Sequence, residues 1–260
     1  MPSWVLRGLP MASLEALPIL LKELRLSTIG KCWEALAQQA LDGQWLPQQY
    51  LAALCEEEVN ERYQQRLKRY LHEAQLPAGK RLSHFDFSAV HGIKANQVKA
   101  LVEQPQWVKQ AHNLLLFGPS GIGKTHLACG IAAGLLEKGF RAKFFSATAL
   151  VQQLQQAKEK LLLAEMLLRL DRYEVLLLDD IGYVKKSNQE TQALFELIAH
   201  RYETGSLIIT SNHPFSEWGQ IFEDNMMTVA AIDRLVHHAT ILECQGESYR
   251  RQSAMDRRQN

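Results

Sequence analysis

The chain has 260 residues, of which 47% are hydrophobic and 22% are charged, and its formal net charge is +1. These values are ordinary for a globular protein that buries a substantial core, and the length allows one good-sized domain beside a smaller one. A net charge this small argues neither for nor against a nucleic-acid partner, so any DNA-binding surface has to be local.

The N-terminal residues are only weakly apolar and are interrupted by prolines and charges. They resemble neither a signal peptide nor a membrane span, so we expect no membrane association. The cysteines show no metal-ligand spacing, which favours reduced thiols in a reducing compartment. They are Cys32, Cys55, Cys129 and Cys244. Together these features predict a cytoplasmic protein.

Residues 1–76 are predicted to form an entirely helical N-terminal domain. Short amphipathic stretches occupy residues 17–26 and 31–41. Pro47 stands where a longer helix can begin, because the first turn of a helix leaves its N–H groups unpaired. In that helix apolar side chains recur every four residues from Val59 to Leu71, which predicts one apolar stripe.

The periodicity changes after a linker that contains Pro77 and Gly79. Five short apolar runs then alternate with helical patterns. The runs are residues 113–118, 141–147, 174–180, 206–212 and 239–244. Continuously apolar strands separated by helices favour a parallel sheet that is covered on both faces. One helix opens with Ser187 and Glu190 in capping-box spacing. Residues 77–260 are therefore predicted to form an α/β domain.

A phosphate-binding loop is the strongest motif. Residues 118–125 read GPSGIGKT, between a predicted strand and a predicted helix, and fit the pattern G-x-x-x-x-G-K-[ST]. Backbone N–H groups of such a loop surround phosphate oxygens at the helix N-terminus. Lys124 is expected to reach the β- and γ-phosphates, and Thr125 to bind Mg²⁺. The predicted nucleotide-binding residues are Gly118, Pro119, Ser120, Gly121, Ile122, Gly123, Lys124, Thr125 and His126.

Two adjacent aspartates end the third apolar run. Buried carboxylates are costly unless a positive group meets them. In P-loop proteins an aspartate at this place holds the Mg²⁺ that accompanies the nucleotide, and Asp179 fits that role. Asp180 follows it, where a second acid can orient or deprotonate water. The alternative for Asp180 is a cap or turn residue before Gly182.

Three further features accompany the last two strands. If the fourth strand lies between the P-loop strand and the Asp179 strand, Asn212 lies beside the γ-phosphate, although asparagine also favours turns. Arg234 precedes the last strand, and arginine often stabilises transferred phosphoryl charge, with a structural ion pair as the alternative. The adjacent His237 and His238 are expected to project about 100° apart on a helix, which makes a poor metal site.

The P-loop, followed in order by LLLDDIGY, TSNHPFSEW, IDRLVHHA and GESYRRQ, resembles the IstB-like transposition helper ATPases. These are relatives of the DnaC helicase loaders and of DnaA in the AAA+ superfamily. The resemblance covers nearly the whole chain. It implies hydrolysis of ATP with Mg²⁺ by a P-loop domain with strand order 5-1-4-3-2. It also implies that Asn212 is a phosphate sensor and that Arg234 acts from a neighbouring subunit of a homo-oligomer.

The resemblance implies partners as well. It suggests ATP-dependent assembly on double-stranded DNA, deformation of that DNA, and recruitment or stimulation of a transposase by the N-terminal domain, with hydrolysis as a timing switch. Residues 148–172, expected to form two helices, match a helical insertion that faces DNA in DnaA- and DnaC-like proteins. Lysine and arginine there would contact phosphates without reading bases. The candidates are Lys158, Lys160, Arg169, Lys185 and Lys186. For each lysine taken separately, an ordinary solvated surface position is the favoured alternative.

The pattern departs from typical AAA+ proteins after the last strand. Few residues follow, so most of the helical C-terminal lid is expected to be missing, and neither Arg250 nor Arg251 is assigned as a second sensor. A DnaC-like helicase loader is the main alternative function, because it would share the ATPase residues and differ in its partner. A small-molecule kinase is less favoured, since no separate acceptor site is visible. A nucleotide-binding protein without turnover fits if Asp180 is only a cap.

Overall fold

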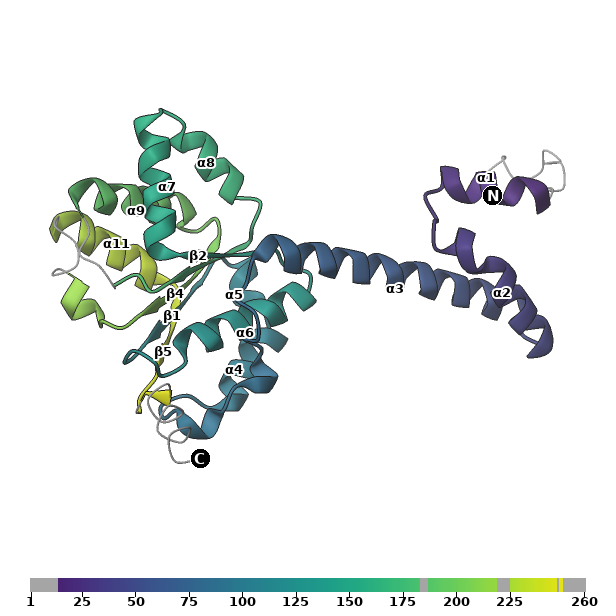
Figure 1. Ribbon diagram of the computed structural model, residues 1–260, viewed down its shortest axis with the longest axis horizontal. Coiled ribbons are helices and arrows are strands. Elements are labelled where there is room, and N and C mark those ends of the chain that lie inside the picture. Colours follow the sequence, from purple (N-terminus) through teal and green to yellow (C-terminus); the bar gives the residue numbers. More distant parts are fainter. Residues whose placement is uncertain (1–13, 183–186, 219–224, 247, 250–260) are drawn as a thin grey trace, which may run out of the picture. The chain divides into compact units, whose positions relative to one another are not determined.

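The computed structural model describes residues 14–182, 187–218, 225–246 and 248–249 (Figure 1). The chain divides into two compact units, Met1–Lys68 and Arg69–Asn260. Among the described residues, no helix has both the length and the apolar character needed to span a membrane.

The described part of the first unit is helical, as the sequence predicts. It contains η1 (Leu14–Ala16), α1 (Leu17–Glu23), α2 (Ile29–Asp42) and most of α3 (Pro47–Ala74), which begins at the expected proline. Leu21, Ile29 and Leu54 form its buried apolar cluster. A residue remote in sequence binds the unpaired N–H groups at the N-terminus of α2. The Glu58 carboxylate accepts hydrogen bonds from the backbone N–H groups of Thr28 and Ile29, at 2.8 and 3.1 Å.

The second unit is built on a five-stranded sheet in the order β2-β3-β4-β1-β5, with parallel pairing throughout. The strands are β1 (Asn113–Phe117), β2 (Ala142–Ser146), β3 (Val175–Asp179), β4 (Ser206–Ser211) and β5 (Ala239–Glu243). Read from the other edge, this is the predicted order 5-1-4-3-2. β4 therefore lies between the P-loop strand and the strand of Asp179, which was the condition for placing Asn212 near the phosphates.

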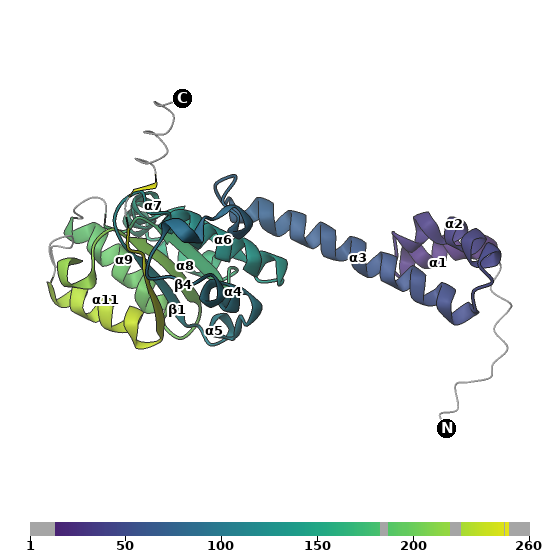
Figure 2. The ribbon, with the colours of Figure 1, turned by 90° about the horizontal axis from the view of Figure 1, so that it is seen from below.

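Helices cover both faces of the sheet (Figures 1 and 2). One face carries α7 (Ala147–Glu159), α8 (Leu163–Leu170), α9 (Asn188–Arg201) and α11 (Asn225–His237). The other carries α4 (Ala95–Glu103), α5 (Gln106–Lys109) and α6 (Lys124–Glu137). The shorter elements are η2 (Leu82–His84), η3 (Phe87–Ala89) and η4 (Phe215–Glu217). The predicted pair of helices in residues 148–172 is confirmed by α7 and α8.

The helix boundaries follow local sequence signals. Ser187 caps α9: its hydroxyl accepts from the Glu190 N–H while the Glu190 carboxylate accepts from the Ser187 N–H, which confirms the predicted capping box. The main core lies between the sheet and the α7–α9–α11 face, and it includes the fully buried Leu150, Leu197 and Trp218. This packing holds β1, β3 and β4 side by side, so that their carboxyl-terminal ends lie close together.

Candidate nucleotide site

The P-loop runs from the carboxyl-terminal end of β1 into α6. Gly118 has φ +147°, and a Cβ added there would lie 2.3 Å from the backbone oxygen of Cys244, so only glycine fits beside the end of β5. Lys124 is the first residue of α6 and is buried. Its Nζ donates to the backbone oxygens of Gly118 and Pro119, at 2.6 and 2.9 Å. The ammonium group therefore lies over the loop that would receive phosphates.

A cavity of about 370 Å³ opens beside the loop, a volume suited to a small-molecule ligand. It is lined by most of the predicted nucleotide-binding residues and by three residues from the ends of β3 and β4. These are Ser120, Gly121, Ile122, Gly123, Lys124, Thr125 and His126, with Asp180, Thr210 and Asn212. Gly118 and Pro119 do not line the cavity but accept hydrogen bonds from Lys124. The structure thus brings the P-loop and the ends of β3 and β4 to one cavity.

The two aspartates are placed differently. Thr210 Oγ1 donates to Asp179 Oδ1 at 2.7 Å and accepts from the Asp180 backbone N–H at 2.8 Å, which links the ends of β3 and β4. Asp180 lines the cavity, whereas Asp179 is half-buried and does not line it. The backbone of Asp180 has φ +65°, a conformation that aspartate tolerates better than most residues and that often occurs at functional sites.

Asn212 follows β4 and presents its side chain to the cavity. Its Oδ1 is buried and has no hydrogen-bond partner among the described residues. The turn that follows is satisfied without it, because Ser211 Oγ donates to the backbone oxygen of His213 and accepts from its N–H. A buried acceptor without a partner is rare in folded proteins, and here it belongs to a residue that lines the cavity, so a small rotation of the amide would let a bound ligand or a water molecule satisfy it.

The linker after α3 supplies a wall that the motifs did not indicate. Six of its residues line the cavity: Lys80, His84, Phe85, Asp86, Ala89 and Val90. Tyr249, from the C-terminal part of the chain, lines it as well. The ring of Phe85 packs edge-on against His126, with centroids 5.3 Å apart. It also reaches Gly123, where an added Cβ would lie 2.9 Å from the ring. The aromatic pair in HFDF was the only sequence signal for this wall.

Residues 19–257 match the family of IstB-like ATP binding proteins. The chain belongs to that family. It is 48% identical over 240 residues to an insertion sequence ATP-binding protein of Sinorhizobium fredii, covering 92% of this chain and 80% of that protein. It is 36% identical over 234 residues to the insertion sequence IS21 ATP-binding protein of Pseudomonas aeruginosa, covering 90% and 88%. The resemblance inferred from the motifs is confirmed.

The fold of this IstB-like chain is similar to that of the DnaC helicase loader. The crystal structure of the DnaC helicase loader superposes with a TM-score of 0.51 over 68% of this chain and 99% of that chain, at 22% sequence identity. At this identity the likeness establishes the P-loop architecture alone.

Arg234 does not line the cavity of its own chain. It lies on α11, where its guanidinium donates to the backbone oxygen of Ala230 at 3.0 Å and stands over the ring of Phe195 at 5.1 Å. No role in hydrolysis within the same chain follows from this position.

The basic candidates on α7 and α8 are partly engaged with neighbouring carboxylates. Lys158 pairs with Glu196 at 2.7 Å, and Arg169 pairs with Glu165. Lys160 and Arg169 border a second cavity of about 450 Å³ between α7, α8 and the edge strand β2, together with Lys143 and Arg172. Lys185, Lys186, Arg250 and Arg251 lie outside the described residues.

The expectation that His237 and His238 project apart is wrong. α11 ends at His237, so His238 lies beyond the helix and the 100° spacing of helical residues does not apply. The two rings lie with their centroids 4.0 Å apart.

Proposed function

We propose that this IstB-like protein is an ATPase that assembles on double-stranded DNA and delivers it to the transposase of its insertion sequence. The observation that carries the catalytic part is that Asp180 and Asn212 line the same cavity as Lys124, with the Asn212 Oδ1 still without a hydrogen-bond partner in the described chain. Water activation needs a carboxylate or amide beside the phosphate site.

ATP binding needs little rearrangement of the loop. The Nζ of Lys124, now held by two backbone oxygens, would exchange them for β- and γ-phosphate oxygens. The hydroxyl of Thr125 and the carboxylate of Asp179 offer the oxygen ligands that Mg²⁺ prefers, so the residues present fit that ion. When bound, Mg²⁺ supplies positive charge that offsets the charge developing on the phosphates.

Hydrolysis is assigned to side chains at the ends of β3 and β4. Asp180 would accept a hydrogen bond, and then a proton, from the attacking water. Asn212 would accept a second hydrogen bond from that water through Oδ1 and donate from its amide nitrogen to the γ-phosphate. A carboxylate as short as aspartate has a short reach, which suits slow hydrolysis controlled by partners and hence a timing switch.

A second subunit would complete the site. Because Arg234 is directed at α9 in its own chain, we assign its phosphate contact to a neighbouring copy in a homo-oligomer. DNA would contact Lys158, Lys160 and Arg169 on α7 and α8, and Lys185 and Lys186 beyond β3, through phosphates. Residues 1–76 are proposed as the transposase-binding domain and residues 77–260 as the ATPase domain. With such an activity we propose a cytoplasmic location, where the DNA is.

The proposal is tested by measuring ATP hydrolysis and sedimentation with and without duplex DNA. DNA should promote both assembly and turnover; a protein that hydrolyses ATP but never associates with DNA would contradict the proposal. Asp180→Asn should bind ATP and stop turnover, while Lys124→Ala should lose ATP binding. Mixing Arg234→Ala with Lys124→Ala should restore hydrolysis if the arginine acts between subunits, and no recovery at any ratio would count against that arrangement.

A DnaC-like helicase loader remains the second candidate, because the shared fold does not identify the partner. Affinity measurements of the full chain with the transposase encoded beside it and with a replicative helicase separate the two. Tight ATP-dependent binding to the helicase alone would replace transposition by loading.

A further inference from the structure

A cluster of side chains that can bind a metal lies where the strands begin, at the end of the sheet opposite the nucleotide cavity. Glu203 precedes β4, and His237 and His238 precede β5. Each offers one ligand atom, and the three atoms lie within 4.8 Å of one another. None of these residues lines the nucleotide cavity, which is formed at the ends of the strands.

The backbone beneath the two histidines is held in place by β1. The backbone N–H of Asn113 donates to the oxygen of His238 at 2.7 Å. The Asn113 side chain donates to the backbone oxygen of Leu235 at 3.1 Å and accepts from the N–H of Leu207 at 3.0 Å. One buried asparagine therefore fixes the end of α11 against the starts of β1 and β4.

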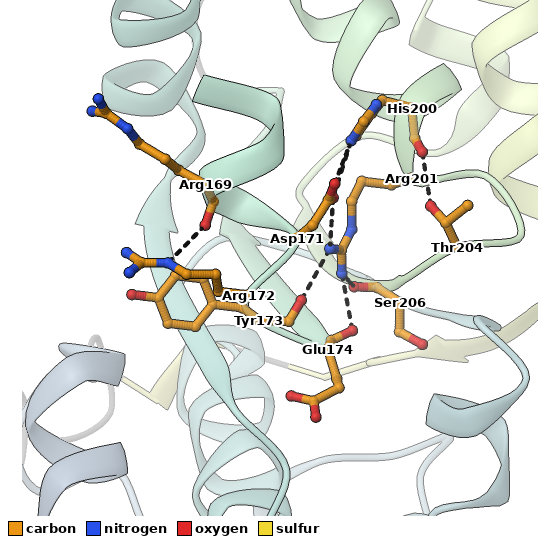
Figure 3. A network of polar contacts seen from close by, with 9 residues as sticks. All are labelled: Arg169, Asp171, Arg172, Tyr173, Glu174, His200, Arg201, Thr204 and Ser206. Atoms are coloured by element: carbon orange, nitrogen blue, oxygen red, sulfur yellow. Dashed lines mark hydrogen bonds and ion pairs between the residues drawn. The ribbon is translucent and has the colours of Figure 1, made fainter. Parts of the chain in front are cut away.

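The turn that presents Glu203 is equally constrained (Figure 3). The guanidinium of Arg201, which is 2% exposed, donates to the backbone oxygens of Tyr173 and Glu174, both at 2.9 Å, and of Ser206, at 3.3 Å. Thr204 Oγ1 donates to the backbone oxygen of His200 at 2.8 Å. The Glu203 backbone lies between these anchors with φ +59°. Its carboxylate is thus presented from a fixed turn.

A second layer of contacts orients the imidazoles. The hydroxyl of Tyr202 lies 2.7 Å from Nδ1 of His237, and in the tautomer that carries its proton on Nδ1 the Nε2 of that ring is available as the ligand atom. Metal-bound histidines commonly donate their other N–H to such an oxygen. His112 stacks on His238, with centroids 4.9 Å apart and planes 8° from parallel. The Nε2 of His238 lies 4.0 Å from Oε1 of Glu203.

We propose that Glu203, His237 and His238 bind a divalent transition-metal ion, with Zn²⁺ the expected occupant. Two imidazoles and one carboxylate form a ligand set typical of zinc, with a further position left for water. Zinc ligands lie about 2.0–2.2 Å from the ion, so the three atoms must draw closer on binding. The side chains of Glu203 and His238 are 60% and 41% exposed, so solvent borders the space into which they would move.

Occupancy would add a metal link between two elements that are already joined by packing and by the contact between Tyr202 and His237. The ion would tie the C-terminal end of α11 to the turn between α9 and β4. Arg234 lies on α11 one turn before His237. The ligand would therefore stiffen the helix that carries this arginine, without contact with the nucleotide cavity.

Metal binding is tested on the full chain, treated with chelator and kept reduced. Titration with Co²⁺ reports coordination through its visible absorption, and competition by Zn²⁺ gives the affinity. Glu203→Gln, His237→Gln and His238→Gln should each weaken binding about tenfold or more, and Tyr202→Phe should weaken it about tenfold. His200→Gln is the matched control, because His200 is also a partly exposed histidine beside a carboxylate, Asp171, and lies outside the cluster.

The proposal holds if wild type and His200→Gln bind one ion per chain with equal affinity and the cluster variants do not. Equal binding by wild type and the three cluster variants would overturn it, and so would a Co²⁺ spectrum with thiolate charge-transfer bands, which would place the ion on cysteine. Nucleotide affinity and the metal-free melting temperature should remain unchanged in the cluster variants, which excludes misfolding as the cause of lost binding.

Discussion

Gly205 leaves room for a buried guanidinium, and filling that room should destabilise the sheet. A Cβ at this position would lie 2.2 Å from both Cζ and Nη2 of Arg201. Arg201 is almost fully buried, and it accommodates no such approach without moving away from the three backbone oxygens that it binds (Figure 3). The backbone of Gly205 is not in the left-handed region, so the effect of Gly205→Ala is the collision itself.

The expected loss is about 2–4 kcal/mol in the free energy of unfolding. Overpacking a buried site costs roughly 1–3 kcal/mol. Each hydrogen bond from a charged donor contributes about 1.5–3 kcal/mol, and a displaced guanidinium would weaken at least one of them. Burial lowers the pKa of Arg201 to about 10, so the group remains charged at neutral pH and continues to need these acceptors.

The measurement is urea unfolding followed by circular dichroism, with hydrogen exchange on peptides from β3 and β4 to report the second unit. Arg201→Met supplies the matched background, because methionine keeps the aliphatic stem and removes the guanidinium. In the Arg201→Met background, Gly205→Ala should lower the free energy of unfolding by less than about 1 kcal/mol. The difference between its effects in the two backgrounds is the coupling energy. An equal cost in both backgrounds would refute the collision as its origin.

At the nucleotide site, Asn212→Ala should keep ATP affinity within about threefold and slow single-turnover hydrolysis at least tenfold, because the amide proposed to position the attacking water is lost. Gly118→Ala should abolish ATP binding, since its Cβ would strike the backbone oxygen of Cys244; calorimetry checks this. Burial raises the pKa of Glu58, but backbone N–H groups of α2 and Arg62 outweigh it and lower that pKa. Its contribution to stability is therefore present above pH 4.5 and is lost as the pH falls through the folded pKa, and Glu58→Gln should remove this dependence in hydrogen exchange of α2.

Local patterns predicted the parts of the site that depend on adjacent residues. The P-loop, the strand that ends in Asp179 and the capping box at Ser187 are each specified within a few residues, and all were found where the sequence placed them. The strand order followed from the family resemblance. Asn212 reached the cavity because β4 pairs with both β1 and β3, a long-range arrangement that its own neighbours do not encode.

The features that the sequence did not predict depend on contacts between distant segments. Phe85 lies in a linker without a motif, and it joins the cavity only because that linker packs across Gly123 and His126. Arg201 is a charged residue at a helix end, yet it is buried against the backbone oxygens of the two residues before β3 and of the first residue of β4. The prediction for His237 and His238 assumed that both lie in a helix, whereas α11 ends at His237. Because His238 lies outside the helix, the two rings can come within 4.0 Å of each other.

The backbone of Asp180 makes the choice of aspartate at this position testable. Its φ of +65° is tolerated by aspartate because the short side chain can hydrogen-bond locally, an advantage that glutamate lacks. Asp180→Glu therefore combines a longer reach toward water with backbone strain of roughly 1 kcal/mol. If the short reach limits turnover, the variant should hydrolyse ATP faster than wild type despite slightly lower stability, as measured by single-turnover kinetics with Asp180→Asn as the inactive control. A rate equal to wild type would mean that the reach of the carboxylate does not set the speed of hydrolysis, and the proposed link between this aspartate and a timing switch would then be withdrawn.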